Sequence, residues 1–139
     1  MRWIVSWMKG ILLISGALTS TMFYAAVDPD AALRSTFGDT VEGPIAEIVV
    51  RNWGVLIGLM GLMLLYAAFD VAARPLVLTV AGTSKLVFIG LILVAGRPFL
   101  AHQAGVAVVC DLIQVALFAA YLIAAPRAGR ASALADAGH

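Results

Sequence analysis

Four long apolar stretches constrain this chain more than any other feature of its sequence. A helix needs about 20 mostly apolar residues to cross a bilayer, and inside the bilayer its backbone N–H and C=O groups must bond within the segment. The stretches cover residues 3–27, 45–69, 76–96 and 105–125. The sequence therefore predicts an all-α integral membrane protein that folds as a four-helix bundle.

Composition agrees with this prediction and narrows the function. Hydrophobic residues make up 63% of the chain and charged residues only 12%, against about 45–50% and about 25% in soluble domains. There is no basic run, so we expect the lipid bilayer and not nucleic acid as a partner. With a single cysteine, Cys110, no internal disulfide is possible, and the two histidines, His102 and His139, cannot supply a bis-histidine haem site within the spans. We expect no cofactor, no metal, no catalytic residue and no enzymatic activity.

The sequence predicts one membrane domain followed by a short tail. Residues 1–126 would form the membrane domain, and residues 127–139 a mobile cytoplasmic tail. The first stretch resembles a signal peptide at its start but is too long for one. It also carries Phe23 and Tyr24 where a cleavage site needs a small residue. We expect this segment to remain as a membrane helix.

Basic residues near the ends of the stretches predict the orientation. Cytoplasmic segments of membrane proteins carry an excess of lysine and arginine. With both termini in the cytoplasm, five basic residues lie inside and three outside: Arg2, Lys9, Arg74, Arg127 and Arg130 against Arg34, Arg51 and Arg97. We expect a multi-pass membrane protein with both termini inside.

The loop between the first two stretches reads as a short extramembrane helix. Asp28 can cap its first turn, Pro29 suits the first helical position, and Gly38 can end it. Beyond it, Glu47 and Arg51 stand four residues apart, in the favourable order for an ion pair on a helix surface. We predict that this segment caps the outer end of the bundle.

Other polar residues near the membrane boundaries are secondary candidates for a site. Asn52 and Arg51 are expected to bond to loop carbonyls, and His102 could titrate near neutral pH. Asp70 and Arg74, again four residues apart, are predicted to form an ion pair at the inner boundary.

Lys85 is the residue that most needs an explanation. It lies in the middle of stretch 76–96, too far from either surface for its side chain to reach water. If the last two stretches form an antiparallel hairpin, Asp111 lies within one helical turn of the level of Lys85. Gln114 shares the face of Asp111. We therefore predict a buried polar cluster of Lys85, Asp111 and Gln114.

Two roles for this cluster remain open. A Lys–Asp pair can lock the register of two helices, because removing one partner leaves an uncompensated buried charge. Ionisable residues within membrane spans also mark proton relays and ligand sites. In that case the cluster would handle a proton or the headgroup of an anionic lipid, a quinone or a metabolite.

The second stretch carries small residues at helical spacing. Gly54 and Gly58 form a GxxxG pattern, and Gly61 extends it. Such a stripe lets another helix approach closely. Packing within one chain is the default, and a homo-oligomer or a larger membrane complex remains open.

The run "RNWGVLIGLMGLMLLYAAFDVAARPLVLTVAGTSKLVFIGLILVAGRPFL" resembles the middle helices of the DoxX-like group of small bacterial four-helix membrane proteins. The likeness lies in the glycine-spaced second span, the arginine-proline hinge and the basic residue at the centre of the third span. It extends over residues 45–125 and implies the four-helix architecture. Some members of that group are linked to quinone-dependent redox complexes or thiosulfate metabolism, but this chain lacks the additional cysteines of a thiol-redox role.

Three functions follow from these observations. The first is a non-enzymatic accessory or interaction protein of the inner membrane, whose core the Lys85–Asp111 pair holds together. The second is a small transport or ligand-binding protein that uses the Lys85–Asp111–Gln114 cluster. A membrane subunit of a redox complex is the third.

Overall fold

The chain is helical over almost all of residues 2–136, which are the residues that the computed structural model describes. The elements in chain order are α1 (Arg2–Ser20), η1 (Thr21–Phe23), α2 (Tyr24–Val27), α3 (Pro29–Phe37), α4 (Pro44–Phe69), α5 (Arg74–Ala95), η2 (Arg97–Ala101) and α6 (Gln103–Asp136). η1 and η2 are short 3-10 segments.

Four helical segments within the described residues are long and apolar enough to cross a membrane. They are Ser6–Val27, Pro44–Phe69, Arg74–Ala95 and Gln103–Pro126. The protein is therefore a small multi-pass membrane protein, as the sequence predicted, with the short helix α3 between its first two spans.

Two element boundaries differ from the predicted ones. The first span is interrupted at Thr21–Phe23, where the Thr21 hydroxyl donates to the Leu18 carbonyl and a 3-10 turn replaces the α-helix. The last helix does not end near residue 125 but continues through Pro126 to Asp136, because the alanine-rich sequence on both sides favours a helix. The predicted mobility of the tail stays a prediction, and its residues 137–139 lie outside the described residues.

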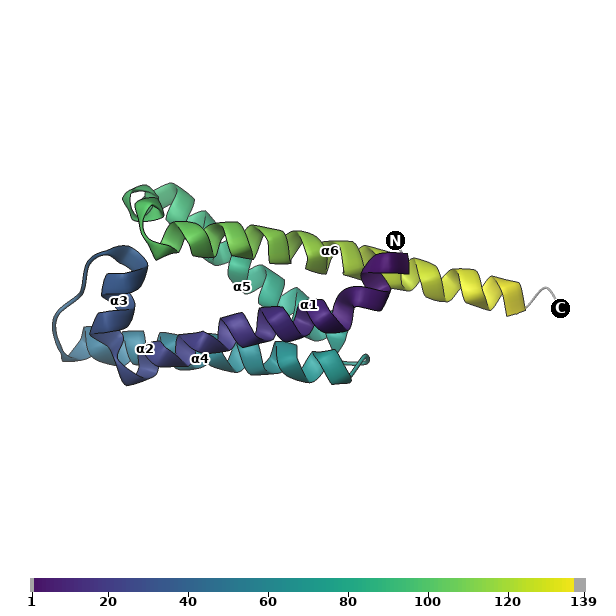
Figure 1. Cartoon of the computed structure of the whole chain (residues 1–139), viewed down its shortest axis with the longest axis horizontal. Helices are drawn as coiled ribbons and strands as arrows, with labels where there is room; N and C mark the ends of the chain where they lie inside the picture. The colour runs from purple at the N-terminus through teal and green to yellow at the C-terminus, as the bar shows by residue number, and fades with distance from the viewer. Residues whose placement is uncertain (1, 137–139) are drawn as a thin grey trace.

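The four spans form two closely packed pairs. Figure 1 shows α1 lying along α4 and α5 lying along α6, with α3 at the end of the bundle opposite the N-terminus. Small residues explain the first pair. Gly54, Gly58 and Gly61 of α4 are buried against α2, η1 and the end of α1, and a Cβ atom added at Gly61 would lie 2.4 Å from the Ser20 nitrogen. The glycine stripe therefore serves packing within the chain.

The two pairs meet in a core near the end that holds the N-terminus. Its buried side chains come from all four spans: Met8, Leu12, Leu64, Ala67, Ala68, Val77, Leu78, Ala81, Phe118 and Tyr121. We call this the packed core. Farther along the bundle a smaller cluster of Ile89, Ile92, Ala104 and Val108 joins α5 to α6, and Phe37 of α3 packs against it.

Helix α3 connects the two pairs at the opposite end. The Asp28 carboxylate accepts a hydrogen bond from the Ala31 N–H at 3.0 Å, and Gly38 ends the helix with a φ of 75°. Phe37, the last residue of α3, lies 6.2 Å from the Trp53 ring of α4 and 5.5 Å from the Phe99 ring of η2. These aromatic contacts hold α3 across the end of the bundle.

Candidate functional site

A cavity of about 530 Å³ lies between the two helix pairs, on the α3 side of the packed core. We call it the central cavity. Every span contributes to its wall: Leu18, Thr19, Thr21 and Met22 from the first; Trp53, Leu56, Ile57 and Met60 from α4; Ala81, Ser84, Lys85 and Phe88 from α5; and Gln103, Ala107, Cys110, Asp111 and Gln114 from α6, with Thr36 of α3.

Helical spacing explains why these residues share one wall. On α5 the residues that face the cavity recur after three or four positions, from Ala81 through Lys85 to Phe88. On α6 the same spacing connects Asp111 and Gln114. Residues three or four apart lie on one face of a helix, so each helix turns a single face toward the cavity.

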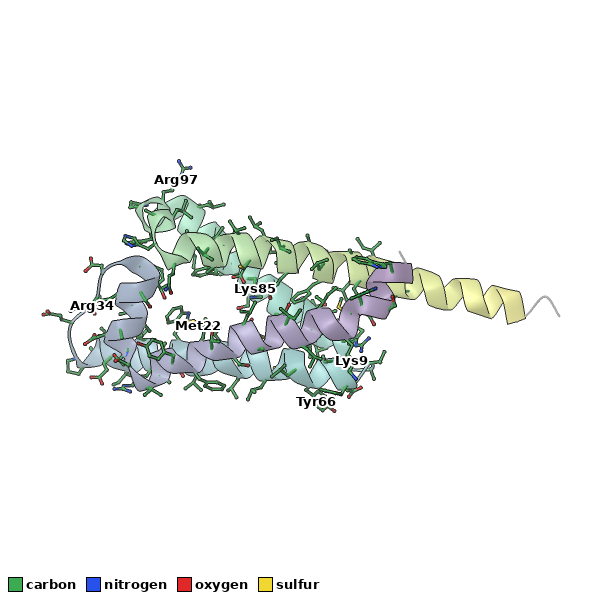
Figure 2. The ribbon with its side chains drawn as sticks, in the orientation of Figure 1. Lys9, Met22, Arg34, Tyr66, Lys85 and Arg97 are labelled. Atoms are coloured by element: carbon green, nitrogen blue, oxygen red, sulfur yellow. The ribbon has the colours of Figure 1, made fainter. Side chains whose placement is uncertain are left out.

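Lys85 and Asp111 form an ion pair in this wall. The lysine Nζ lies 2.5 Å from an Asp111 carboxylate oxygen, and the two side chains are only 10% and 15% exposed. Figure 2 shows Lys85 and Met22 extending into the space between the two pairs of helices. The structure thus brings together the predicted partners, and it places them at the edge of a cavity and not in a sealed core.

Gln114 is the third predicted member of the cluster and has a different environment. Its side chain lines the same cavity and is only 7% exposed. Among the described residues its Oε1 atom, which is buried, has no hydrogen-bond partner. A buried carbonyl-type oxygen without a donor costs free energy, of the order of 1–3 kcal/mol. The site therefore offers one unused acceptor next to the ion pair.

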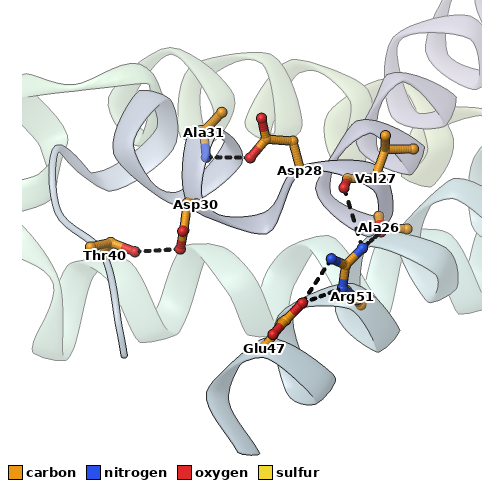
Figure 3. A network of polar contacts seen from close by, with 8 residues as sticks. All are labelled: Ala26, Val27, Asp28, Asp30, Ala31, Thr40, Glu47 and Arg51. Atoms are coloured by element: carbon orange, nitrogen blue, oxygen red, sulfur yellow. Dashed lines mark hydrogen bonds and ion pairs between the residues drawn. The ribbon is translucent and has the colours of Figure 1, made fainter. Parts of the chain in front are cut away.

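The secondary candidates lie outside the central cavity. Arg51 donates to the Glu47 carboxylate at 2.8 Å and to the carbonyls of Ala26 and Val27, as Figure 3 shows. Arg51 therefore bonds to carbonyls at the end of the first span, in α2, and not to the loop carbonyls that the sequence predicted. Asn52 is exposed and does not line the cavity.

The histidine of the η2–α6 connection is also remote from the ion pair. His102 is exposed, and its ring lies against Gly38, where an added Cβ would come within 2.3 Å of it. It belongs to the contact between α3 and the start of α6. It does not take part in the cluster.

A second cavity, of about 550 Å³, lies beside α3 and the start of α4. Its wall is polar, and three of its carboxylates already have partners. Asp28 caps α3, Asp30 accepts from the Thr40 hydroxyl at 3.0 Å, and Glu47 binds Arg51 (Figure 3). No such unused buried group favours a ligand here among the described residues.

The predicted ion pair between Asp70 and Arg74 is wrong. Arg74 is buried and donates to the Ala67 and Ala68 carbonyls at 2.9 and 3.1 Å, because the last carbonyls of α4 have no partner in their own helix. Asp70 instead accepts from the Tyr66 hydroxyl at 2.8 Å and from the Ala72 N–H. The Tyr66 hydrogen bond lowers the pKa of Asp70 from its ordinary value.

The cavity and the apolar side chains that line it do not follow from the sequence. Trp53 carried no prediction, and Cys110 counted only as the single cysteine. Each of them lies at helical spacing from other cavity residues on its own helix. That pattern can be recognised only once it is known which helices face one another.

The fold and the site define a small α-helical membrane protein with an ion pair inside its membrane-spanning region. No family model, no curated protein and no solved structure matches the chain. The resemblance to the DoxX-like group therefore has no support from these comparisons.

Proposed function

We propose that this protein is a non-enzymatic membrane protein that binds one small amphipathic ligand in its central cavity. The polar part of the ligand would lie at Lys85, Asp111 and Gln114, and its apolar part along the hydrophobic wall. The observation that carries the proposal is the buried Gln114 oxygen, which has no donor among the described residues and belongs to a side chain that lines a cavity of about 530 Å³. Pockets of about 300–1,000 Å³ are typical of small-molecule sites.

The cavity also favours ligand binding over a purely structural lock. A Lys85–Asp111 pair that only joins α5 to α6 needs no space beside it. The packed core shows that the two helix pairs of this chain do close against one another where their side chains allow it. At the level of the ion pair they stay apart, and interiors without voids are the rule in folded proteins. An accessory role, the first function considered from the sequence, gives no reason for this space.

The excess of basic residues at one end of the spans supports an orientation. We propose that both termini lie in the cytoplasm and that the protein resides in a bacterial inner membrane. Four spans place both termini on the same side of the membrane. On this basis α3 lies on the outer side.

Native mass spectrometry tests the proposal. The full-length protein, extracted from its own membrane in a mild detergent, should retain one bound small molecule at a stoichiometry near one. Gln114→Leu should lower that occupancy, because it removes the acceptor while keeping the apolar volume. Asn52→Leu is the matched control, since it removes an exposed amide outside the cavity and should leave the occupancy unchanged.

The proposal fails if wild-type protein carries only detergent and bulk phospholipid and Gln114→Leu does not change the bound masses. An equal loss of ligand occupancy in Gln114→Leu and Asn52→Leu would also contradict the proposal, because the effect would then come from the fold and not from the cavity.

A further inference from the structure

We infer that the ligand is an uncharged amphipath with a hydrogen-bond donor, and that it reaches the central cavity sideways from the bilayer. The inference rests on the proposed function and adds the chemical class of the ligand and its route.

Both ends of the cavity along the bundle are closed by protein. Toward the N-terminal end lies the packed core, in which Leu12, Leu78 and Phe118 are 0–1% exposed. Toward the other end α3 lies across the bundle, held by Phe37 against Trp53 and Phe99. Thr36 of α3 itself lines the cavity. Neither end provides an open path from water to Lys85.

The sides of the cavity are open. Its wall includes residues that are themselves exposed, Leu18 of α1 and Leu56 of α4 among them, at 53% and 56%. Cys110 of α6, which also lines the cavity, is exposed as well. All three residues lie within the membrane-spanning segments. An opening at this level leads to hydrocarbon, so the ligand must dissolve in the bilayer.

The ion pair limits the charge of the ligand. Lys85 and Asp111 neutralise each other, and the pair is nearly buried. An anionic headgroup beside Lys85 would also lie near the Asp111 carboxylate and would bring a net charge into a region of low dielectric. A cationic headgroup meets the same difficulty at Lys85. An uncharged polar group avoids both costs.

Gln114 determines the kind of polar group. Its buried Oε1 is an acceptor that has no donor among the described residues, so a hydroxyl or an N–H of the ligand would satisfy it. Thr19 and Ser84 add hydroxyls to the same wall, and Trp53, Phe88 and Met60 supply apolar surface. The cavity therefore combines a polar region that lacks a hydrogen-bond donor with a hydrophobic wall.

The chain contains two natural reporters of occupancy. Trp53 lines the cavity, and the other two tryptophans, Trp3 and Trp7, are exposed near the N-terminus at 64% and 59%. Phenylalanine at positions 3 and 7 would leave Trp53 as the only tryptophan. Cys110 is the only cysteine of the chain and also lines the cavity.

The experiment uses the full chain with Trp3→Phe and Trp7→Phe in lipid nanodiscs. Three probes share one dibrominated acyl or alkyl chain, which quenches tryptophan on contact, and differ in their heads. They are a monoacylglycerol (uncharged, with donors), a fatty acid methyl ester (uncharged, without a donor) and an alkyl sulfate (anionic). We expect saturable quenching of Trp53 at low mole fraction by the monoacylglycerol, about three- to tenfold tighter than by the methyl ester, which is the contribution of one hydrogen bond.

Two variants separate the hydrogen bond from general partitioning. Gln114→Leu should reduce the affinity for the monoacylglycerol to that for the methyl ester. Asn52→Leu should retain the difference. If the alkyl sulfate binds more tightly than the monoacylglycerol, or if Gln114→Leu does not affect the preference, the inferred ligand class is wrong.

A measurement on the unaltered chain keeps the inference testable if a variant fails to fold. Saturating monoacylglycerol in the bilayer should slow the alkylation of Cys110 by N-ethylmaleimide, and the methyl ester at the same mole fraction should slow it less. If none of the three probes acts on Trp53 or Cys110 while native mass spectrometry shows a bound molecule, the inference fails and the proposed function stands. If no bound molecule is found either, both fail.

Discussion

The two halves of this bundle have similar apolar sequences but are packed differently. In the half that holds the N-terminus, side chains from all four spans interlock, with Met8, Leu12 and Leu64 fully buried. In the other half the α1–α4 pair and the α5–α6 pair each remain closely packed, but a cavity of about 530 Å³ separates them. The charged pair and the unpartnered amide lie in the wall of that cavity.

The difference shows what close packing alone contributes to this fold. Lipid tails are as apolar as leucine side chains, so spans associate through van der Waals contact, small residues and polar bonds. The packed core depends on van der Waals contact, and the glycine stripe of α4 provides the small residues. In the wall of the cavity the third kind is added, the Lys85–Asp111 ion pair between α5 and α6.

The largest effect should follow from breaking that pair. Lys85→Met or Asp111→Leu alone should lower the free energy of unfolding by about 3–5 kcal/mol, because each leaves an unpaired charge at the bilayer centre. The double variant should recover most of this loss. SDS-induced unfolding in mixed micelles measures all three. Additive losses in the double variant would show that the two residues do not depend on each other.

A smaller effect on stability should distinguish the two halves when a phenylalanine in each is replaced by alanine. Phe118 in the packed core is 1% exposed, whereas Phe88 borders the central cavity and is only partly buried. Phe118→Ala should cost about 3 kcal/mol, at the lower end for such truncations because lipid also solvates an exposed phenylalanine. Phe88→Ala should cost about 1 kcal/mol or less. Equal losses in the same unfolding assay would contradict the contrast between the halves.

The smallest effects concern two glycines in helix interiors. Gly61→Ala should destabilise the bundle by about 1–3 kcal/mol, since its Cβ would meet the Ser20 backbone at 2.4 Å. At Gly90 nothing lies within 4 Å of an added Cβ, so Gly90→Ala should stabilise the protein by up to about 1 kcal/mol through helix propensity. Thermal unfolding in detergent compares both with the wild type, and a stable Gly61→Ala protein would mean that the seam between α1 and α4 can relax.

Much of the architecture follows from the sequence. Runs of about 20 apolar residues have few alternatives to membrane helices, so the spans and the capped helix α3 were predictable, as was the pairing of Lys85 with Asp111 across a hairpin. The ends of the helices were less so. Thr21 breaks the first span by a local side-chain hydrogen bond, and Pro126 fails to end the last helix. Both depend on small differences in local energy.

The site was predicted only in part because a cavity is a property of facing helices. Lys85, Asp111 and Gln114 could be placed together from their spacing on α5 and α6, but Trp53 and Met22 come from the other pair. Arg74 shows the same limit. Its spacing from Asp70 predicted an ion pair, whereas its guanidinium bonds to the last carbonyls of α4.

The position of the ion pair also has a consequence for biosynthesis. Lys85 is synthesised before Asp111, and a lysine at the centre of a helix raises the cost of its insertion from the translocon by about 2.5–3.5 kcal/mol. We therefore expect α5 and α6 to enter the membrane together, as a helical hairpin. In chains truncated before Gln103, glycosylation mapping in microsomes should show incomplete insertion of α5, which Lys85→Leu restores. Complete insertion of the truncated wild-type chain would mean that α5 enters the membrane before its partner helix exists.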